Sequence, residues 1–484
     1  MTRTECPRML RNLARFATHF SAPPTCNSVV SKSIRIKLLI AVLNLELRNR
    51  PGISADAALP ISHHKRKRVK RLCHFPYCFE NLERVDTTYR SGTIPYNIAW
   101  QTFANALQIY TSLDPLFMSS IISGTNELDQ YDFDLPRELI AQEPLAQRVD
   151  SRMMVINRAS QSIEHAHVRD LPTFLKAGDT LVVNDSKVIP ARLIGTRTLT
   201  GGRWEGLFLR QDDSGVAELL CKTRGSIAIG ETITLRDMEG RDQGQLVFLG
   251  TGDEGRMLMR PASPESWFAL LDRCGRVPLP PYIRDGQMVD EDKQRYQTVY
   301  ARVAGSVAAP TAGLHFTPEL IQRTRTAGMA LVAVTLHVGV GTFRPIQVNR
   351  LEDHRMHSEY GEISESVAKR LKTTRSEKGR IVAVGTTSVR VLETAAAYAK
   401  QKYSELTIEP LTIEPWAGET DIFIKPGHRF LAVDGLLTNF HLPKSSLIVL
   451  VSAFAGRDLV LKAYHEAIRE RYRFYSYGDC MLIT

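Results

Sequence analysis

Four apolar runs that alternate with helical patterns are the feature that most constrains the fold of this chain. The runs cover residues 180–184, 330–336, 380–385 and 446–451. The helical patterns cover residues 364–375, 388–402 and 458–471. Apolar runs of this length are typical of strands that are buried on both faces. Because strands that alternate with helices form an α/β layer, we predict such a layer, with ligands bound beyond the carboxyl ends of its strands.

A different pattern interrupts this series between residues 192 and 261. Six short segments there alternate apolar and polar residues, and glycine or aspartate recurs about every ten residues, which is typical of a small antiparallel barrel. We therefore predict the fold class α/β, with a mixed α/β main domain of residues 128–191 and 262–484. A small antiparallel β-barrel domain of residues 192–261 is inserted into it.

Residues 1–127 differ from the rest of the chain. They carry +9 of the formal net charge of +10, so the basic charge is poor evidence that the main body binds nucleic acid. Their basic run at 65–71 could contact RNA phosphates, the arginine-rich start could be a transit peptide, and Cys73 and Cys78 could form half of a metal knuckle. We expect instead an extension that forms no domain and is dispensable for catalysis.

The composition excludes several classes of protein. The apolar stretch at 38–43 is far shorter than the roughly 18 residues that a membrane span needs, so no membrane helix is expected. Seven cysteines without regular spacing argue against a secreted disulfide framework and for a reducing compartment. We expect a cytoplasmic protein and a monomer.

Polar residues gather where the predicted strands end. GSVAAPTAGLHFT is a run of small residues that contains His315 and precedes a helix capped by Thr317, and a tight packing turn is its alternative interpretation. LHVGVGTFRP ends a strand in His337 and a glycine loop, but no third glycine opens a helix, so it is only a partial dinucleotide fingerprint. GTTSVRVLE opens a helix through hydroxyl residues and lacks the lysine of a phosphate-binding loop.

Two further groups of residues could carry chemistry. HRMHSE spaces His354 and His357 three residues apart, as a metal site on a helix would. No H-E-x-x-H pattern accompanies them, so we expect no metal and a segment that leads into a strand and presents one histidine and Glu359 to a site. In YRFYSYGDCMLI, Arg473 and Asp479 lie beside three tyrosines and are polar groups that a packed core would have to satisfy.

The order of the segments resembles a known family. VVNDSKVIPARL, GSVAAPTAGLHFT, LHVGVGTFRP, HRMHSE, VGTTSVRVLE, TDIFIKPG, LLTNFHLPKSSL and YRFYSYGDCMLI together closely resemble the S-adenosylmethionine:tRNA ribosyltransferase-isomerases of queuosine biosynthesis. The resemblance runs from about residue 129 to residue 484. It implies a transferase and isomerase that moves the ribosyl part of S-adenosylmethionine onto 7-aminomethyl-7-deazaguanine at the tRNA wobble position. The implied products are epoxyqueuosine in tRNA, adenine and methionine, and S-adenosylmethionine is a co-substrate, with no cofactor needed.

This chemistry implies particular tasks for the residues in the resembling motifs. The sulfonium acidifies the ribose 5′ carbon, so a base must remove a proton there and an acid must help adenine leave. We expect His315 and His441 to be the proton-transfer pair, and Glu359 and Asp479 to orient a base or to pair with a cation of the substrate. The expected substrate-binding residues are His337, Arg344, His357, Thr386, Thr387, Ser388, Arg390, Asn439 and Arg473.

Within that set, Arg344 and Arg390 are expected to hold the methionine carboxylate or a tRNA phosphate, because a guanidinium can bind an oxyanion through two hydrogen bonds. The hydroxyls of Thr386, Thr387 and Ser388 could bind ribose hydroxyls or a carboxylate.

Two other functions remain open on sequence grounds. A barrel joined to an α/β domain could bind structured RNA without altering it. A pure binder would not need several groups with near-neutral pKa at strand ends, however. An S-adenosylmethionine methyltransferase is disfavoured because the G-x-G-x-G turn expected after its first strand is missing.

Overall fold

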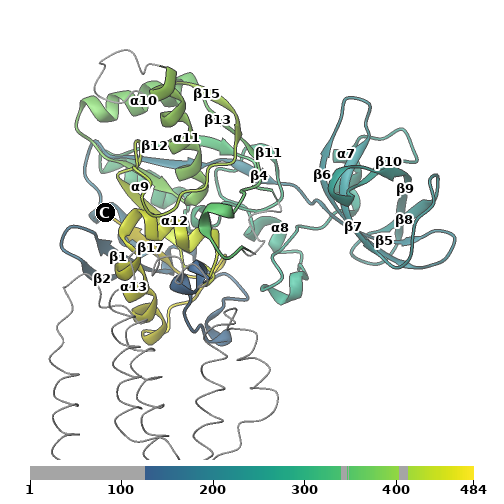
Figure 1. Ribbon diagram of the computed structural model, residues 1–484, viewed down its shortest axis with the longest axis horizontal. Helices are drawn as coiled ribbons and strands as arrows, with labels where there is room; N and C mark the ends of the chain where they lie inside the picture. Colours follow the sequence, from purple (N-terminus) through teal and green to yellow (C-terminus); the bar gives the residue numbers. More distant parts are fainter. Residues whose placement is uncertain (1–125, 340–345, 347, 403–412) are drawn as a thin grey trace, which may run out of the picture. The chain divides into compact units, whose positions relative to one another are not determined.

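The computed structural model describes residues 126–339, 346, 348–402 and 413–484. These residues form a nine-stranded mixed sheet with helices packed against it. A separate six-stranded antiparallel sheet closes into a barrel (Figure 1). The predicted fold class, a mixed α/β domain with an inserted antiparallel β-barrel, is therefore confirmed. In the described part of the chain, no helix has both the length and the apolar content that a membrane crossing requires.

The main sheet has the strand order β15-β13-β12-β3-β14-β16-β17-β1-β2. Its strands are β1 Arg152–Asn157, β2 Ser162–His167, β3 Thr180–Asn184, β12 Ala330–Leu336, β13 Glu359–Ile363, β14 Ile381–Val384, β15 Trp416–Thr420, β16 Gly435–Asn439 and β17 Cys480–Ile483. Four central strands run parallel to one another: β12, β3, β14 and β16. Three of the four predicted strands are thus adjacent at the centre of the sheet, where apolar runs are favoured.

Helices cover both faces of this sheet. They are α9 Pro318–Thr326, α10 Glu365–Ser376, α11 Thr386–Lys402, α12 Ser446–Ala455 and α13 Arg457–Arg469, with the 3₁₀ turn η8 Thr311–His315. The short helix α8, Asp292–Arg295, precedes β11 in the chain. Alternate residues of β3 enter two different cores: Val182 packs with residues of α10, α11 and α12, whereas Leu181 and Val183 pack with residues of α9. Alternation of this kind follows from the two-residue period of a strand and explains why every β3 residue is buried.

The predicted strand at residues 446–451 is wrong, because these residues begin helix α12. The Ser445 side chain accepts a hydrogen bond from the backbone N–H of Ile448 at 3.3 Å, which caps the helix start. The apolar stretch then continues to Ala455, and the helix is buried in the main core. A short apolar run fits a buried helix as well as a buried strand, so periodicity could not separate them.

The inserted barrel has the strand order β10-β7-β6-β5-β8-β9. Its strands are β5 Arg192–Arg197, β6 Arg203–Gln211, β7 Ala217–Thr223, β8 Thr232–Arg236, β9 Asp242–Thr251 and β10 Met257–Pro261. Helix α7, Trp267–Cys274, lies among these strands (Figure 1) and packs Trp267 against Phe208 in the barrel core, with ring centroids 5.2 Å apart. The barrel core therefore extends beyond residue 261, where the inserted domain was expected to end. A two-stranded sheet pairs β4 Ser186–Val188 with β11 Val303–Ser306.

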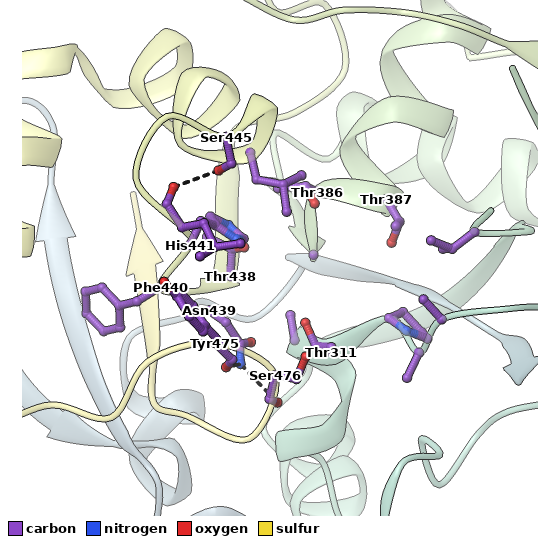
Figure 2. A pocket seen from close by; sticks show the side chains of 18 of the residues that line it. Thr311, Thr386, Thr387, Thr438, Asn439, Phe440, His441, Ser445, Tyr475 and Ser476 are labelled. Atoms are coloured by element: carbon purple, nitrogen blue, oxygen red, sulfur yellow. Dashed lines mark hydrogen bonds between the residues drawn. The ribbon is translucent and has the colours of Figure 1, made fainter. Parts of the chain in front are cut away.

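The carboxyl ends of β14 and β16 lie at the same edge of the main sheet because the two strands are parallel. The backbone N–H of Gly385, directly after β14, donates to the Leu437 carbonyl of β16 at 2.8 Å. Gly385 has a φ of +87°, which side-chain-bearing residues rarely adopt, and this turn starts α11. Thr386 and Thr387 are thereby placed beside the segment that follows β16 (Figure 2).

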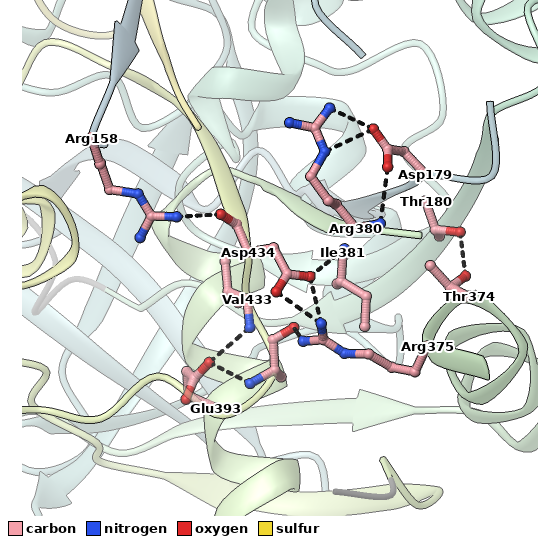
Figure 3. A network of polar contacts seen from close by, with 11 residues as sticks. Arg158, Asp179, Thr180, Thr374, Arg375, Arg380, Ile381, Glu393, Val433 and Asp434 are labelled. Carbon is pink, nitrogen blue, oxygen red and sulfur yellow. Dashed lines mark hydrogen bonds and ion pairs between the residues drawn. The ribbon is translucent and has the colours of Figure 1, made fainter. Parts of the chain in front are cut away.

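Charged residues tie the amino ends of the parallel strands together (Figure 3). Asp179, before β3, pairs with Arg380, before β14, at 2.7 Å. Asp434, before β16, pairs with Arg375 at 2.7 Å and accepts a hydrogen bond from the Ile381 N–H at 2.7 Å. These contacts fix the register of the strands at one edge of the sheet, and the opposite edge is left for a ligand site.

Candidate active site

A pocket of about 740 Å³, including the part open to solvent, lies at the carboxyl ends of β14 and β16. Its wall consists of residues 308–312, 385–387, 438–442 and 475–476, together with Tyr282, Val338, Ser445 and Leu447. Among the described residues that line it, none is an Asp, Glu, Lys or Arg, and the polar side chains are hydroxyls, one amide and one imidazole. The side chains of this wall therefore present no full charge to a ligand.

The imidazole in this wall belongs to His441, which is 8% exposed. Its Nε2 and the Thr438 hydroxyl share a hydrogen bond of 2.9 Å, and its backbone N–H donates to the Tyr464 hydroxyl at 2.9 Å. Burial lowers the pKa of His441 to about 3. The ring is therefore held in place and is neutral at physiological pH.

Asn439 lies beside His441 in the pocket wall. Its amide Nδ2 donates to the Tyr475 carbonyl at 2.9 Å and to the Ser476 carbonyl at 3.4 Å. The Asn439 side chain is buried and also forms a hydrogen bond with the His315 side chain.

The start of α11 forms another part of the wall. The N–H groups of residues 386–388 have no partner within the helix, as in the first turn of any α-helix. Thr386 and Thr387 both line the pocket, and the buried Thr387 Oγ1 has no hydrogen-bond partner within the described ranges. Ser388, the third predicted hydroxyl, donates to the Val384 carbonyl at 2.9 Å and does not line the pocket.

His315 lies at the end of η8, whose residues Thr311 and Ala312 line the pocket. The His315 side chain itself is not part of the wall, but it forms a hydrogen bond with the side chain of Asn439, which lines the pocket. Burial lowers the pKa of His315 to about 4; the hydrogen bond with Asn439 acts in the opposite direction, and the charges of Arg473 and Arg148 lower the pKa further. The two predicted proton-transfer histidines are thus both buried and neutral, but only His441 faces the pocket.

Asp479 and Arg473 hold the loop that precedes β17. Asp479 accepts hydrogen bonds from the backbone N–H groups of Arg152 at 3.0 Å and Arg473 at 2.8 Å. Arg473 Nη1 donates to the Glu143 carbonyl at 3.3 Å. Neither residue lines the pocket. Asp479 is buried, and its hydrogen bonds to the backbone hold the loop that carries Tyr475 and Ser476.

Glu359 and Arg390 form a buried ion pair with each other. Their side chains are 4% and 6% exposed. Glu359 Oε1 also accepts from the Gly339 N–H at 2.8 Å, and Arg390 Nη2 donates to the Thr420 carbonyl at 3.0 Å. The structure therefore brings the predicted carboxylate and the predicted arginine to one another, outside the wall of the pocket.

The remaining predicted residues are dispersed. The His337 ring stacks on the Tyr360 ring, with centroids 6.1 Å apart and planes at 20°, and burial lowers its pKa. His357 is exposed in the segment before β13. Arg344 lies outside the described residues. Where the structure describes the chain, no group of three or more His, Cys, Asp or Glu side chains could hold a metal ion.

Several residues of the pocket were missed by sequence analysis. They are Tyr282, Thr311, Thr438, Ser445, Tyr475 and Ser476. Five of them belong to motifs that had been singled out, so proximity to His315, His441 or Arg473 was the available signal: Thr311, Thr438, Ser445, Tyr475 and Ser476. Tyr282 had no such signal, because it is brought to the site by tertiary contacts: its hydroxyl and that of Ser476 lie 2.8 Å apart, and its ring centroid lies 4.7 Å from that of Tyr475.

Both histidines should remain neutral as the pH falls from about 8 to about 5.5, because burial lowers their pKa values from 6.5. In the unfolded chain they bind protons below about 6.5, so the free energy of unfolding should decrease as the pH falls from about 6.5 toward 4. Titration of the imidazole C–H resonances by NMR, assigned with His315→Ala and His441→Ala, checks the first expectation. A midpoint near 6.5 for either ring would contradict it.

Comparisons with known proteins agree on one family. A family model described as "Queuosine biosynthesis protein" matches residues 128–483. A protein of Desulforamulus reducens named S-adenosylmethionine:tRNA ribosyltransferase-isomerase is 48% identical over 357 residues, which is 74% of this chain and 99% of the relative. A protein of Symbiobacterium thermophilum with the same name is 50% identical over 356 residues, again 74% of this chain and 99% of the relative.

A solved structure was also found. The crystal structure of an S-adenosylmethionine tRNA ribosyltransferase from Thermotoga maritima is 35% identical in sequence, with a TM-score of 0.40. The match covers 73% of this chain and all of that chain.

Proposed function

Because this chain belongs to the queuosine biosynthesis protein family, we propose that it is an S-adenosylmethionine:tRNA ribosyltransferase-isomerase, as its relatives are named. It transfers and isomerises the ribosyl part of S-adenosylmethionine onto 7-aminomethyl-7-deazaguanine in tRNA, and releases adenine and methionine. The observation that carries the proposal is that four segments of the resembling motifs, far apart in sequence, form one pocket. We further propose that the enzyme acts in the cytoplasm as a monomer and without a cofactor.

The pocket suits the first step of this reaction. A base must remove a proton from the ribose 5′ carbon, and His441 is the histidine that lines the pocket. Its lowered pKa leaves the ring unprotonated and able to accept a proton, and the same shift makes it a weaker base than an exposed histidine. The imidazolium formed is a strong acid for the same reason, so it gives the proton up readily. We assign His315 to assisting the departure of adenine as a hydrogen-bond donor through its neutral N–H, without transfer of a proton.

The start of α11 suits the binding of the ribose or of the methionine carboxylate. Free N–H groups at a helix start favour oxyanions and hydroxyl oxygens. The Thr386 and Thr387 hydroxyls add further hydrogen-bonding groups at the same place. Both residues hold substrate in this proposal, and neither moves a proton.

Labelled S-adenosylmethionine tests the function. The protein is incubated with ribose-labelled or methyl-labelled S-adenosylmethionine and with tRNA that carries 7-aminomethyl-7-deazaguanine. Ribose label in the tRNA together with free adenine supports ribosyl transfer, and tRNA with guanine at the wobble position is the control that should stay unlabelled. Transfer of the methyl label alone would show a methyltransferase. Binding of tRNA without any transfer would show an RNA-binding module.

Removal of residues 1–125 should leave turnover unchanged at moderate salt, because the family match begins at residue 128. At low salt the shortened enzyme should bind tRNA more weakly, since the basic run at 65–71 can add screened phosphate contacts. Steady-state kinetics at two salt concentrations measure both effects. Loss of turnover at every salt concentration would contradict this expectation.

The cut should fall before Asn126 rather than at residue 128. Asn126 Oδ1 accepts from the Leu128 N–H at 3.1 Å, and Glu127 Oε2 accepts from the Leu351 N–H at 2.8 Å. A chain that begins at 128 loses both contacts and should be less stable to urea by about 1–2 kcal/mol than one that begins at 126.

A further inference from the structure

The outer face of the β6–β7 hairpin in the barrel carries a group of positive charges (Figure 1). The two strands are paired so that Trp204 lies opposite Thr223, and the Thr223 hydroxyl donates to the Arg203 carbonyl at 3.1 Å. Trp204 points into the barrel core. Because side chains alternate along a strand, Arg203 points outward, and so do Lys222 and Arg224 on the partner strand. We call these three cations the basic hairpin face.

No acid of the protein neutralises this face. All three side chains are exposed, and within the described ranges none of them takes part in an ion pair or a side-chain hydrogen bond. Glu205 lies opposite Lys222, but it accepts a hydrogen bond from Arg192 at 2.7 Å. Like charges on neighbouring positions of a sheet repel each other. An anion from outside the protein would relieve this repulsion.

The face is unusual among the charged residues of the barrel. Seven other arginines of the barrel and of α7 form ion pairs with Asp or Glu: Arg192, Arg197, Arg210, Arg236, Arg241, Arg256 and Arg273. The unpaired cations are therefore not a general property of this domain. They gather at one end of one hairpin.

The loops beside the face, residues 198–202 and 224–231, are tied together. Arg197, which ends β5, donates to the Ser226 carbonyl at 3.0 Å and to both carboxylate oxygens of Glu231, at 2.6 and 2.8 Å. These contacts hold the second loop against the strand that leads into the first. A surface that is already ordered loses little conformational entropy when a partner binds.

The shape and chemistry of the surroundings restrict the partner. The three cations are spread over two strands of an exposed surface, which suits an extended polyanion better than a single small anion. Leu199 and Ile229, on the two tied loops, are 84% and 77% exposed and offer apolar contacts beside the charges. The backbone of RNA combines both requirements, because it alternates phosphates with the less polar faces of its sugars.

We propose that the basic hairpin face of the barrel binds the sugar–phosphate backbone of the substrate tRNA. The inference rests on the proposed function, which supplies the tRNA. It gives the inserted barrel a part in RNA binding that is separate from the pocket of the main domain. Contacts with phosphates carry no direct information about the bases, so the face contributes affinity for tRNA and leaves the choice of base to the pocket.

The first test measures tRNA binding by the full-length protein with Arg203→Gln, Lys222→Gln and Arg224→Gln combined. We expect the affinity at about 0.1 M salt to fall roughly 10- to 100-fold. The slope of log affinity against log salt concentration should become shallower by about 2 to 3, because each lost phosphate contact removes about 0.7–0.9. tRNA with 7-aminomethyl-7-deazaguanine and tRNA with guanine at the wobble position should be weakened by the same factor. Unchanged affinity and slope would overturn the proposal.

Arg260→Gln is the matched control. Arg260 is an exposed cation on β10 without an ion pair in the described part of the chain. Leu258 lies opposite Glu218, so Arg260 is level with the start of β7, whereas Arg224 follows the end of that strand. We expect the tRNA affinity of this variant to stay within about threefold of wild type. A loss as large as that of the triple variant would show a response to overall charge and would overturn the assignment of this face.

The fold should persist in the triple variant, because its three side chains are exposed and unpaired, and circular dichroism checks this. If the triple variant does not fold, Arg224→Gln alone is used. Its salt slope should be shallower by about 0.7–0.9, and an unchanged slope would overturn the proposal.

Steady-state kinetics distinguish this role from a catalytic one. The triple variant should raise the KM for tRNA tenfold or more, with kcat and the KM for S-adenosylmethionine within about twofold of wild type. A lower kcat with an unchanged KM for tRNA would overturn the proposal. If wild-type enzyme transfers labelled ribose and the triple variant binds tRNA normally, only the surface assignment is wrong. If wild-type enzyme transfers no ribose, the proposed function fails, whereas weaker tRNA binding by the triple variant still supports the surface.

Discussion

Replacement of His441 by alanine is expected to lower turnover by roughly 10²- to 10⁴-fold, the usual loss when a proton-transfer group is removed. His441 is the only imidazole among the described residues of the pocket wall, and its hydrogen bonds with Thr438 and Tyr464 hold the ring in place. The fold should persist, because the deletion opens space toward a pocket that already exists. Single-turnover rates with saturating S-adenosylmethionine and tRNA give the chemical step directly.

His465 provides the control for this experiment. It is exposed on α13, and His465→Ala should leave the rate unchanged. Circular dichroism and urea unfolding of both variants show whether a lost rate reflects a lost fold. If soluble, folded His441→Ala retains a rate within about threefold of wild type, His441 has a structural role only.

Replacement of Arg390 by methionine is expected to destabilise the protein by roughly 3–5 kcal/mol, because it leaves the buried Glu359 carboxylate without its cationic partner. Both side chains are almost completely buried, so solvent cannot compensate for the lost ion pair. Urea unfolding measures the change. Arg323→Met, an exposed residue on α9, is the control and should change stability by less than about 0.5 kcal/mol.

The double variant Arg390→Met with Glu359→Gln decides between a structural and a binding role for this pair. If the two residues act on each other, the double variant should be clearly more stable than the sum of the single changes predicts. The predicted contact of Arg390 with the methionine carboxylate or a tRNA phosphate leads to a different result. In that case Arg390→Met would raise the KM of one substrate by tenfold or more while the free energy of unfolding changes by less than about 1 kcal/mol.

The sequence by itself determined the elements whose signals are local. The apolar runs at 180–184 and 330–336 and the short run before Gly385 became β3, β12 and β14, because strands buried on both faces need no alternation. Thr317 and Pro318 set the start of α9 through a hydrogen bond from the Leu320 N–H to the Thr317 side chain. The family could also be predicted, since the order of motifs is itself a property of the sequence.

The candidate site could be predicted only in part. Thr386, Thr387, Asn439 and His441 lie in the pocket wall because the parallel pairing of β14 and β16 brings their carboxyl ends to one edge. Asn439 ends β16, and the other three come two or three residues after the end of β14 or β16. This placement is what the general rule for α/β sheets predicts.

Only the tertiary structure decided which polar groups are free for a ligand and which are used within the protein. Glu359 and Arg390 are 31 residues apart in sequence and are paired in the core, Asp479 binds the backbone of Arg152 from the other end of the chain, and Ser388 bonds to the preceding strand. Residues 446–451 became a helix because the surrounding core accepts one there. Partners of this kind depend on contacts between distant segments, whereas sequence patterns report the secondary structure of neighbouring residues.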